Sequence, residues 1–265
     1  MTRLTPYLLA APAALLRLGL LAGPLALRGR VSLYAPAAGR GFYRPNTWTG
    51  ENFAAVLDGY GLRLAGFTVL FAAGVAAAGV LAAYPLALAI HRLPARWRRP
   101  AVAIVLLPKL VGPLVTLFGL AHLLADAPVP LTRTLAGALA GEATLVVPYL
   151  TLVLVVHLGR LDPALEAAAR GLGASPWQAF RRVTLPLSVP GLVLAGRLGL
   201  VWGLGAFLGP LLLGGPDQTT LSVEAHRQAF EYGRWPRAAA EAVVLLATAG
   251  VCLGVTGRLA RRGAA

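Results

Sequence analysis

The sequence predicts an all-α membrane protein that crosses the bilayer several times. Hydrophobic residues make up 57% of its 265 residues. Only 13% are charged, about half the share that is usual in a soluble domain. Apolar runs of about 20 residues recur along the chain, and a helix of that length crosses a hydrocarbon core about 30 Å thick. The same composition excludes a disordered chain, which is poor in hydrophobic residues and rich in charge.

Six segments are long and apolar enough to be predicted as membrane spans. The whole chain, residues 1–265, is expected to form a single transmembrane domain without an attached soluble domain. A cleavable signal peptide is the alternative for the first segment, although its apolar stretch is too long for a typical signal core and lacks an evident cleavage site. The predicted spans are approximately residues 7–27, 64–90, 101–124, 135–158, 187–213 and 238–256.

The net charge is +14, from 24 basic and 10 acidic residues. Nucleic-acid-binding proteins also carry such a charge, but here the arginines lie in short blocks between apolar runs and form no continuous stripe. The positive-inside rule explains this distribution better, so we expect no nucleic acid among the partners. With a cytoplasmic N-terminus, twelve arginines fall on the inner side and nine on the outer side. We therefore expect both termini in the cytoplasm.

The segment between the fourth and fifth spans, residues 160–186, carries the most information. Asp162 followed by Pro163 is typical of a helix start, because the carboxylate accepts from free N–H groups and proline suits the first helical position. Good helix formers follow, until Gly171 and Gly173 interrupt the helix. The pattern predicts a short helix that ends in a glycine turn.

A second short helix is predicted to begin at Ser175, again followed by proline. Helical spacing places Trp177, Phe180 and Thr184 along one side of it. An amphipathic helix lying on a membrane surface would explain the aromatic and basic residues. The small residues at the turn favour close approach of another backbone, as when a helix docks in a protein groove, and we prefer that interpretation.

This segment resembles the EAA loop of permease subunits of binding-protein-dependent ABC importers. In that family Glu-Ala-Ala precedes a glycine by a fixed spacing, and an apolar residue, any residue and Leu-Pro follow. Anchored on Gly173, the chain matches the second half of the pattern: Val183 lies ten residues later and is followed by a threonine, a leucine and Pro186. The Leu-Gly-Ala-Ser run at residues 172–175 also fits.

The first half of the pattern departs from the family. The glutamate is expected six residues before Gly173, where this chain has Ala167, and Glu166 lies one residue too early. One residue of helix corresponds to a rotation of about 100°. A salt bridge made by the family's glutamate is therefore expected to be re-aimed or absent here.

The resemblance implies a type I ABC importer-like fold of six spans with a cytoplasmic loop of coupling helices. It implies partners: a cytoplasmic ATPase dimer that binds ATP and Mg, a second permease subunit, and an extracytoplasmic substrate-binding protein. The chain has no GxxxxGK[ST] phosphate loop, so no cofactor and no enzymatic activity are expected of it. The location implied is the cell inner membrane. The residues expected to couple to the ATPase are Glu166, Ala167, Ala168, Gly173, Ala174, Ser175, Trp177 and Phe180.

The run from Leu211 through Leu221 to Trp235 resembles the spermidine/putrescine branch of these permeases, within a wider group that includes iron, thiamine and phosphonate importers. Polyamine is therefore the first expectation for the cargo. Lys109, the only lysine, complicates it, because an ionisable residue this deep in a span usually has a partner or a role. On the pathway it would repel a polyamine and favour an anion such as a phosphonate.

The alternative for Lys109 is a structural pair with Glu142 or Glu241, or a position at the inner interface. The candidates for the substrate pathway are Lys109, Trp202 and Glu241, with core or lipid packing as the alternative for the tryptophan. The four histidines show no metal-ligand spacing, and no metal site is expected. An intramembrane enzyme is the competing class, but neither HExxH nor GxSxG occurs in the sequence. An ATP-independent channel would not need coupling helices.

Overall fold

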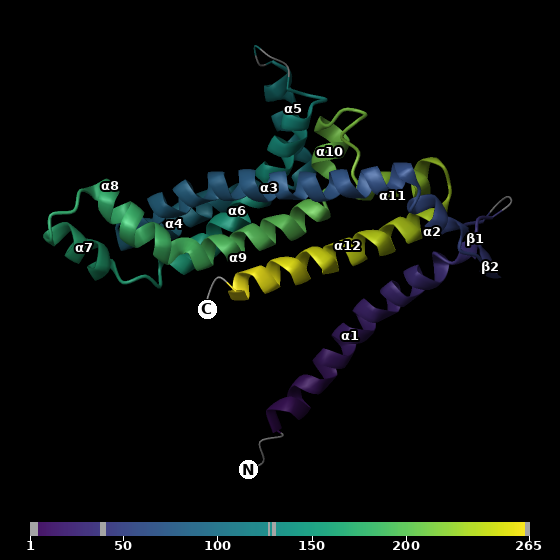
Figure 1. Ribbon diagram of the computed structural model, residues 1–265, viewed down its shortest axis with the longest axis horizontal. Helices are drawn as coiled ribbons and strands as arrows, with labels where there is room; N and C mark the ends of the chain where they lie inside the picture. Colours follow the sequence, from purple (N-terminus) through teal and green to yellow (C-terminus); the bar gives the residue numbers. More distant parts are fainter. Residues whose placement is uncertain (1–4, 38–40, 127, 129–130, 263–265) are drawn as a thin grey trace. The chain divides into compact units, whose positions relative to one another are not determined.

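The computed structural model describes residues 5–37, 41–126, 128 and 131–262 (Figure 1). Arg3 and Arg40, which the orientation argument counts, lie outside these residues. Among the described residues, four helices are long and apolar enough to cross a membrane. They are α3 (Gly59–Arg92), α6 (Leu135–Leu158), the continuous run of α8 (Pro176–Ala179), η2 (Phe180–Thr184) and α9 (Leu185–Leu204), and α12 (Trp235–Arg262).

The third predicted span is a broken helix. Helix α4 (Ala95–Leu106) and the short 3₁₀ turn η1 (Leu107–Lys109) meet α5 (Pro113–Ala125) at 87°, and the pair makes a fifth crossing if it counts as one span. Two prolines remove backbone donors at the break, and Gly112 between them has φ +85°. The span predicted over residues 101–124 is therefore not one continuous helix but is bent between Lys109 and Pro113.

The first predicted span forms helix α1 (Thr5–Val31). Helix α1 is not among the helices of the described residues that are long and apolar enough to cross a membrane. Six crossings thus stay a prediction. The fifth predicted span, residues 187–213, is shorter than expected: α9 ends at Leu204 and a separate helix, α10 (Leu208–Leu213), follows.

The chain divides into two compact units. The first comprises Met1–Arg63 and Glu224–Thr248. It contains a small antiparallel pair of strands, β1 (Tyr34–Ala35) and β2 (Arg44–Trp48), and the helix α2 (Glu51–Val56). The polar stretch at residues 47–57 is of a kind that can form a short surface helix, and the helix observed there starts at Glu51, because β2 takes up the first residues.

In this first unit the buried side chain of Asn52 ties the elements together. Its Nδ2 donates hydrogen bonds to the carbonyl oxygens of Ser32 and Tyr34, both at 2.9 Å. The first unit also contains the second half of α11 (Leu221–His226) and the π-helical turn η3 (Arg227–Glu231), followed by the start of α12.

The second unit comprises Leu64–Val223 and Ala249–Ala265, and its core lies where α3, α6 and α9 pack together. Small residues allow α9 to approach α3 closely. A Cβ added at Gly203 would lie 2.6 Å from the Cα of Ala72, and one at Gly199 would lie 3.0 Å from the Cα of Ala76. The close contacts of α9 with α3 thus lie two and six residues before Gly205.

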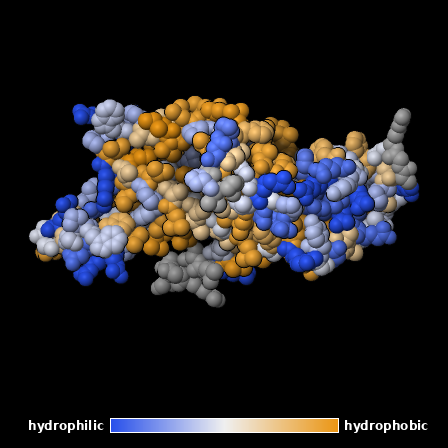
Figure 2. Space-filling view, turned by 90° about the horizontal axis from the view of Figure 1, so that it is seen from above, coloured by the Kyte–Doolittle hydropathy of each residue, from blue (hydrophilic) through white to orange (hydrophobic). Residues whose placement is uncertain are grey.

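Figure 2 shows that hydrophobic residues cover the middle of the face in view, while hydrophilic residues gather at the end where Figure 1 places α7 (Pro163–Gly171) and α8. In Figure 1 these two short helices form an elbow beyond the ends of α6 and α9. We call residues 160–186 the elbow. A polar elbow beside apolar helix surfaces is what a loop outside the bilayer requires.

Candidate coupling elbow and buried polar residues

The first helix of the elbow begins where the sequence predicts. The Asp162 carboxylate accepts a hydrogen bond from the backbone N–H of Ala164 at 2.9 Å, and Pro163 occupies the first turn. The helix ends at Gly171, and Gly173 follows with φ +90°. That left-handed conformation suits glycine, which explains the residue on which the sequence pattern is anchored.

The turn is a Schellman motif. The N–H of Gly173 donates to the carbonyl of Arg170 at 3.0 Å, and the N–H of Ala174 donates to the carbonyl of Ala169 at 3.1 Å. Two carbonyls that the helix end leaves free are thereby satisfied. The turn therefore has one defined geometry without help from another chain.

The second helix begins with a full capping box. The N–H of Gln178 donates to Ser175 Oγ at 3.2 Å, and the N–H of Ser175 donates to Gln178 Oε1 at 2.9 Å. Sequence reasoning identified Ser175 but missed Gln178, although the Ser-x-x-Gln spacing signals this motif. The rings of Trp177 and Phe180 stack with centroids 5.4 Å apart, and Phe180 reaches Tyr84 of α3 at 6.4 Å.

Apolar side chains at the tip of the elbow are exposed. Leu172 is 91% exposed, and Trp177 is 66% exposed. Ala167 and Ala168 are also exposed on α7, whereas Ala174 is half-buried in the turn. Capped helix ends combined with uncovered apolar side chains are typical of a preformed docking surface.

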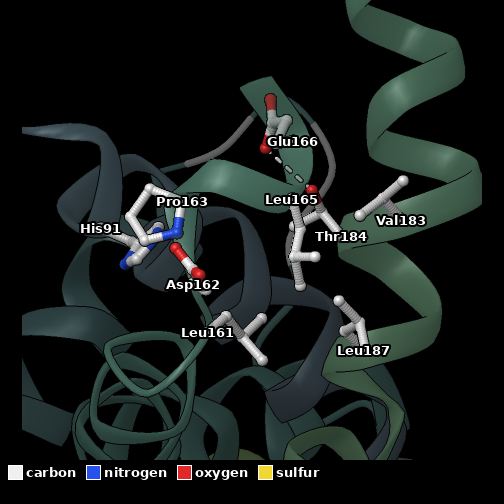
Figure 3. Close-up of a pocket in the computed structure, with 9 residues that line it drawn as sticks. All are labelled: His91, Leu161, Asp162, Pro163, Leu165, Glu166, Val183, Thr184 and Leu187. Atoms are coloured by element: carbon white, nitrogen blue, oxygen red, sulfur yellow. Dashed lines mark hydrogen bonds between the residues drawn. The ribbon is translucent and has the colours of Figure 1, made fainter. Parts of the chain in front are cut away.

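Glu166 lies in a pocket where α3, α7 and η2 meet (Figure 3). Its Oε2 accepts a hydrogen bond from Thr184 Oγ1 at 2.8 Å, and its Oε1 lies 3.7 Å from Arg92 Nη2. Glu166, which lies one residue before the position expected from the family pattern, thus makes its polar contacts within this chain. It joins the first helix of the elbow to the end of α3 and to the turn that leads into α9.

The structure gives Lys109 a partner within the chain. Its Nζ donates a hydrogen bond to the carbonyl oxygen of Leu145 and lies over two aromatic rings, 4.7 Å from the Tyr149 centroid and 5.5 Å from the Trp202 centroid. Cation–π contacts of this kind stabilise a partly desolvated cation. Of the predicted pairings with Glu142 and Glu241, neither is seen as a direct ion pair among the described residues.

Glu142 has a structural role instead. Only 2% of the residue is exposed, and its carboxylate accepts hydrogen bonds from the indole of Trp202 at 3.3 Å and from the N–H groups of Phe207 at 3.1 Å and Gly209 at 3.3 Å. It therefore satisfies donors at the start of α10, where the predicted fifth span breaks. A Cβ at Gly209 would lie 2.7 Å from the Glu142 Cγ, so the residue at that position must be glycine.

Gly205 and Gly209 lie four residues apart, a spacing that makes a close helix contact possible, and the structure shows such a contact for one of them. Gly209 packs tightly against α6, whereas the nearest atom to a Cβ at Gly205 is a carbonyl of its own helix, 3.6 Å away. Glu241, the third pathway candidate, is 2% exposed and lies 3.4 Å from the Nε of Arg237 on the same helix. No group of three potential metal ligands occurs in the part of the chain that the structure describes.

The fold and the elbow together define a permease, the membrane-embedded subunit of a transporter. The chain belongs to the family described as binding-protein-dependent transport system inner membrane component, whose sequence profile matches residues 77–262. It is a multi-pass inner-membrane protein and the permease subunit of an ABC importer. The predicted class and family are confirmed.

Similar proteins that are named as transport permeases support the assignment to this family. The chain is 25% identical over 229 residues to the spermidine/putrescine transport system permease protein PotB of Escherichia coli, which covers 81% of this chain and 83% of that protein. It is 27% identical over 220 residues to a putative 2-aminoethylphosphonate permease protein, PhnV, of Salmonella paratyphi A, covering 82% of each. A probable molybdenum ABC transporter permease of Haloferax volcanii is 34% identical over 135 residues, covering 49% of this chain and 50% of that protein.

Two solved structures share the fold. A bacterial ABC transporter involved in the import of alginate matches 97% of this chain and 95% of its own with a TM-score of 0.69 at 18% identity. The alginate transporter in complex with an alginate pentasaccharide-bound periplasmic protein matches 97% and 94% with a TM-score of 0.72 at 19% identity. The fold is that of an ABC importer permease.

Proposed function

We propose that the elbow docks on a cytoplasmic ATPase dimer and couples ATP-driven closure of that dimer to the membrane helices. In this proposal the chain forms half of the translocation pathway, a second permease subunit forms the other half, and an extracytoplasmic binding protein delivers the cargo. Both termini then lie in the cytoplasm. The ATPase binds ATP and Mg, and this chain supplies no catalytic group.

The observation that carries the proposal is the exposed apolar tip of the elbow. Burying a leucine or a tryptophan side chain in a groove contributes about 1.5–3 kcal/mol, which is enough to favour a complex that keeps Leu172 and Trp177 out of water. The Schellman turn and the capping box hold the tip in one conformation, so little conformational entropy is lost on docking.

Contacts at the base of the elbow supply a route for the movement. The second helix runs through η2 into α9 without a break, so a displacement of its start acts directly on that span. Glu166 joins the first helix to Arg92 at the end of α3. A push on the elbow therefore reaches two core helices at once, which is how a small interface movement becomes a change in the pathway.

Copurification tests the docking directly. The chain is co-expressed with a candidate ATPase and a candidate second permease subunit from the same organism, and the complex is purified through a tag on the ATPase. We expect L172S and W177A to reduce recovery of the permease by about tenfold, because each removes apolar surface from the interface. L57S, which changes an exposed leucine outside the elbow, is the matched control and should be recovered like the native chain. Equal recovery of all variants would contradict docking through the elbow.

For the cargo we propose a polyamine of the spermidine/putrescine type. The similarity to PotB over four fifths of the chain supports it. A phosphonate is the second candidate, supported by the similarity to PhnV and by the cation of Lys109. Iron and thiamine remain further members of the wider group.

Uptake by the reconstituted complex separates the cargo candidates. We expect accumulation of radiolabelled putrescine to be blocked by excess spermidine and unaffected by 2-aminoethylphosphonate. Competition by the phosphonate alone would contradict the polyamine assignment and leave the coupling proposal intact.

A further inference from the structure

A buried polar cluster lies in the first compact unit, where α11, η3 and the start of α12 meet. It contains two carboxylates, Glu224 at 6% exposure and Glu241 at 2%, together with the amide of Gln228 at 4%. The two carboxylates lie within electrostatic range of each other. Placing two acids in an apolar helix bundle is costly, so such groups usually mark a functional site.

Two acceptor atoms in this cluster have no hydrogen-bond partner among the described residues: Oε1 of Gln228 and Oε2 of Glu241. Other polar atoms of the cluster make hydrogen bonds with one another or with Arg237. The Gln228 Nε2 donates to Glu224 Oε1 at 2.7 Å, and the Arg237 Nε donates to the other oxygen of Glu241 at 3.4 Å. A buried acceptor without a donor costs about 1–3 kcal/mol, so a missing donor is expected at this place.

The backbone around the cluster is built to hold Gln228 in place. The residue lies in the π-helical turn Arg227–Glu231, and π-helical turns are frequent at functional sites. The N–H of Arg234 donates to the Gln228 carbonyl at 2.6 Å, across a turn in which Gly233 has φ +65°. The π-helical turn is thereby joined to the start of α12 through the backbone of Gln228.

The chemistry of the orphaned atoms favours an ammonium group over a metal ion. The described residues contain no group of three acidic, histidine or cysteine side chains close enough to hold a metal. A primary ammonium carries three N–H donors and one positive charge, which suits a carboxylate oxygen, an amide oxygen and a second carboxylate. Arg237 already shows that the cluster pairs with a nitrogen cation, and it leaves one oxygen of Glu241 without a donor.

We propose that Glu224, Gln228 and Glu241 form a binding site for a primary ammonium group of the transported molecule. The proposal rests on the polyamine cargo proposed above and adds the position in the chain that recognises it. Glu241 was a candidate from the sequence, whereas Glu224 and Gln228 were not, because only the fold brings α11 and η3 against α12.

The test is a ligand-induced shift in unfolding temperature, measured on the purified complex with its ATPase and second permease subunit but without the binding protein. Putrescine is the probe, 1,4-butanediol is the uncharged control, and NaCl or MgCl₂ at the same ionic strength tests for a metal site. We expect putrescine alone to raise the unfolding temperature.

E241Q and E224Q should weaken the apparent affinity for putrescine by about tenfold to a hundredfold, as loss of a charge-assisted hydrogen bond does. E231Q changes an exposed glutamate of the same π-helical turn and should keep the native affinity.

A structural role would produce a different result. If E241Q lowered the unfolding temperature of the ligand-free complex and kept the putrescine affinity, the cluster would be a packing feature and the site would be refuted. A shift caused equally by MgCl₂ or NaCl would also overturn it. If the native complex takes up putrescine and E241Q takes it up with the same KM, the site is wrong while the proposed function stands. If the native complex transports only a phosphonate, the cargo and the site fail together while docking through the elbow is unaffected.

Discussion

The elbow and the buried polar cluster differ in what they lack. In the elbow the polar groups at the helix ends are satisfied by the chain's own caps, and the apolar tip is left uncovered. In the cluster the side chains are buried, and two polar oxygens are left without donors. The elbow has its hydrogen bonds satisfied but leaves apolar surface exposed, whereas the cluster is buried but leaves hydrogen-bond acceptors unsatisfied.

This difference indicates what each region is made to meet. Exposed leucine and tryptophan on a rigid turn are stabilised by an apolar groove, which a protein partner supplies. Orphaned oxygens in an apolar bundle are stabilised by a small cation with N–H donors. In the two proposals, the permease couples two unlike binding events, one with a protein outside the membrane helices and one with a small molecule among them.

The largest effect is expected from a change at Glu142, the buried carboxylate whose oxygens are satisfied. E142Q replaces one carboxylate oxygen by an amide N–H₂, which then faces either the Trp202 indole N–H or the N–H groups of Phe207 and Gly209, so it should lower the free energy of unfolding by about 2 kcal/mol or more. E241Q supplies a donor where acceptors are orphaned and should leave that free energy nearly unchanged. Thermal unfolding of the purified complex compares the two variants, and equal losses would remove the distinction between a satisfied and an unsatisfied carboxylate.

Next in size is a change at the elbow's turn. G173V forces a β-branched residue into φ +90° and should reduce copurification with the ATPase severalfold, because the strained turn no longer presents the two helices in one geometry. G171A is the matched control, since a Cβ there meets no atom within 4 Å and the residue is helical. If G173V assembled and transported like G171A, the turn would not be required for docking.

A smaller effect is expected at the base of the elbow. E166Q and R92Q each weaken a partly exposed ion pair, so each should change stability by about 0.5 kcal/mol or less. Their effect on coupling should be larger: ATP hydrolysis by the complex continues while uptake per ATP falls. A double-mutant cycle on uptake per ATP checks this, and additive losses would show that the pair does not transmit the movement.

Local features of the elbow could be predicted from the sequence because each depends on neighbours a few residues away. Asp162, Ser175 and Gly173 all occupy the cap and turn positions that their types favour. The bend between α4 and α5 is also local, since it lies at Pro108, Gly112 and Pro113, whereas the break before α10 depends on contacts across the fold. The groups that donate hydrogen bonds to Glu142 lie 60 to 67 residues further along the chain, and no local sequence pattern indicates pairing over such a separation.

Buried polar groups were the least predictable part for the same reason. A lone glutamate in an apolar run indicates a partner without saying which one. Lys109 is held by a carbonyl and two rings, where the sequence suggested a carboxylate. Gln228 could not be predicted as a binding residue because glutamine carries no charge, and only its burial and its unsatisfied amide oxygen indicate such a role.

The most direct measurement is photocrosslinking from the tip of the elbow in the assembled transporter. A photoreactive residue placed at Trp177 should form a covalent adduct with the ATPase subunit, and the yield should change between the nucleotide-free and ATP-bound states. The same probe at Leu57 should give no such adduct. If position 177 reacted only with lipid or with proteins outside the cytoplasm, the assignment of this segment as the coupling element would be contradicted.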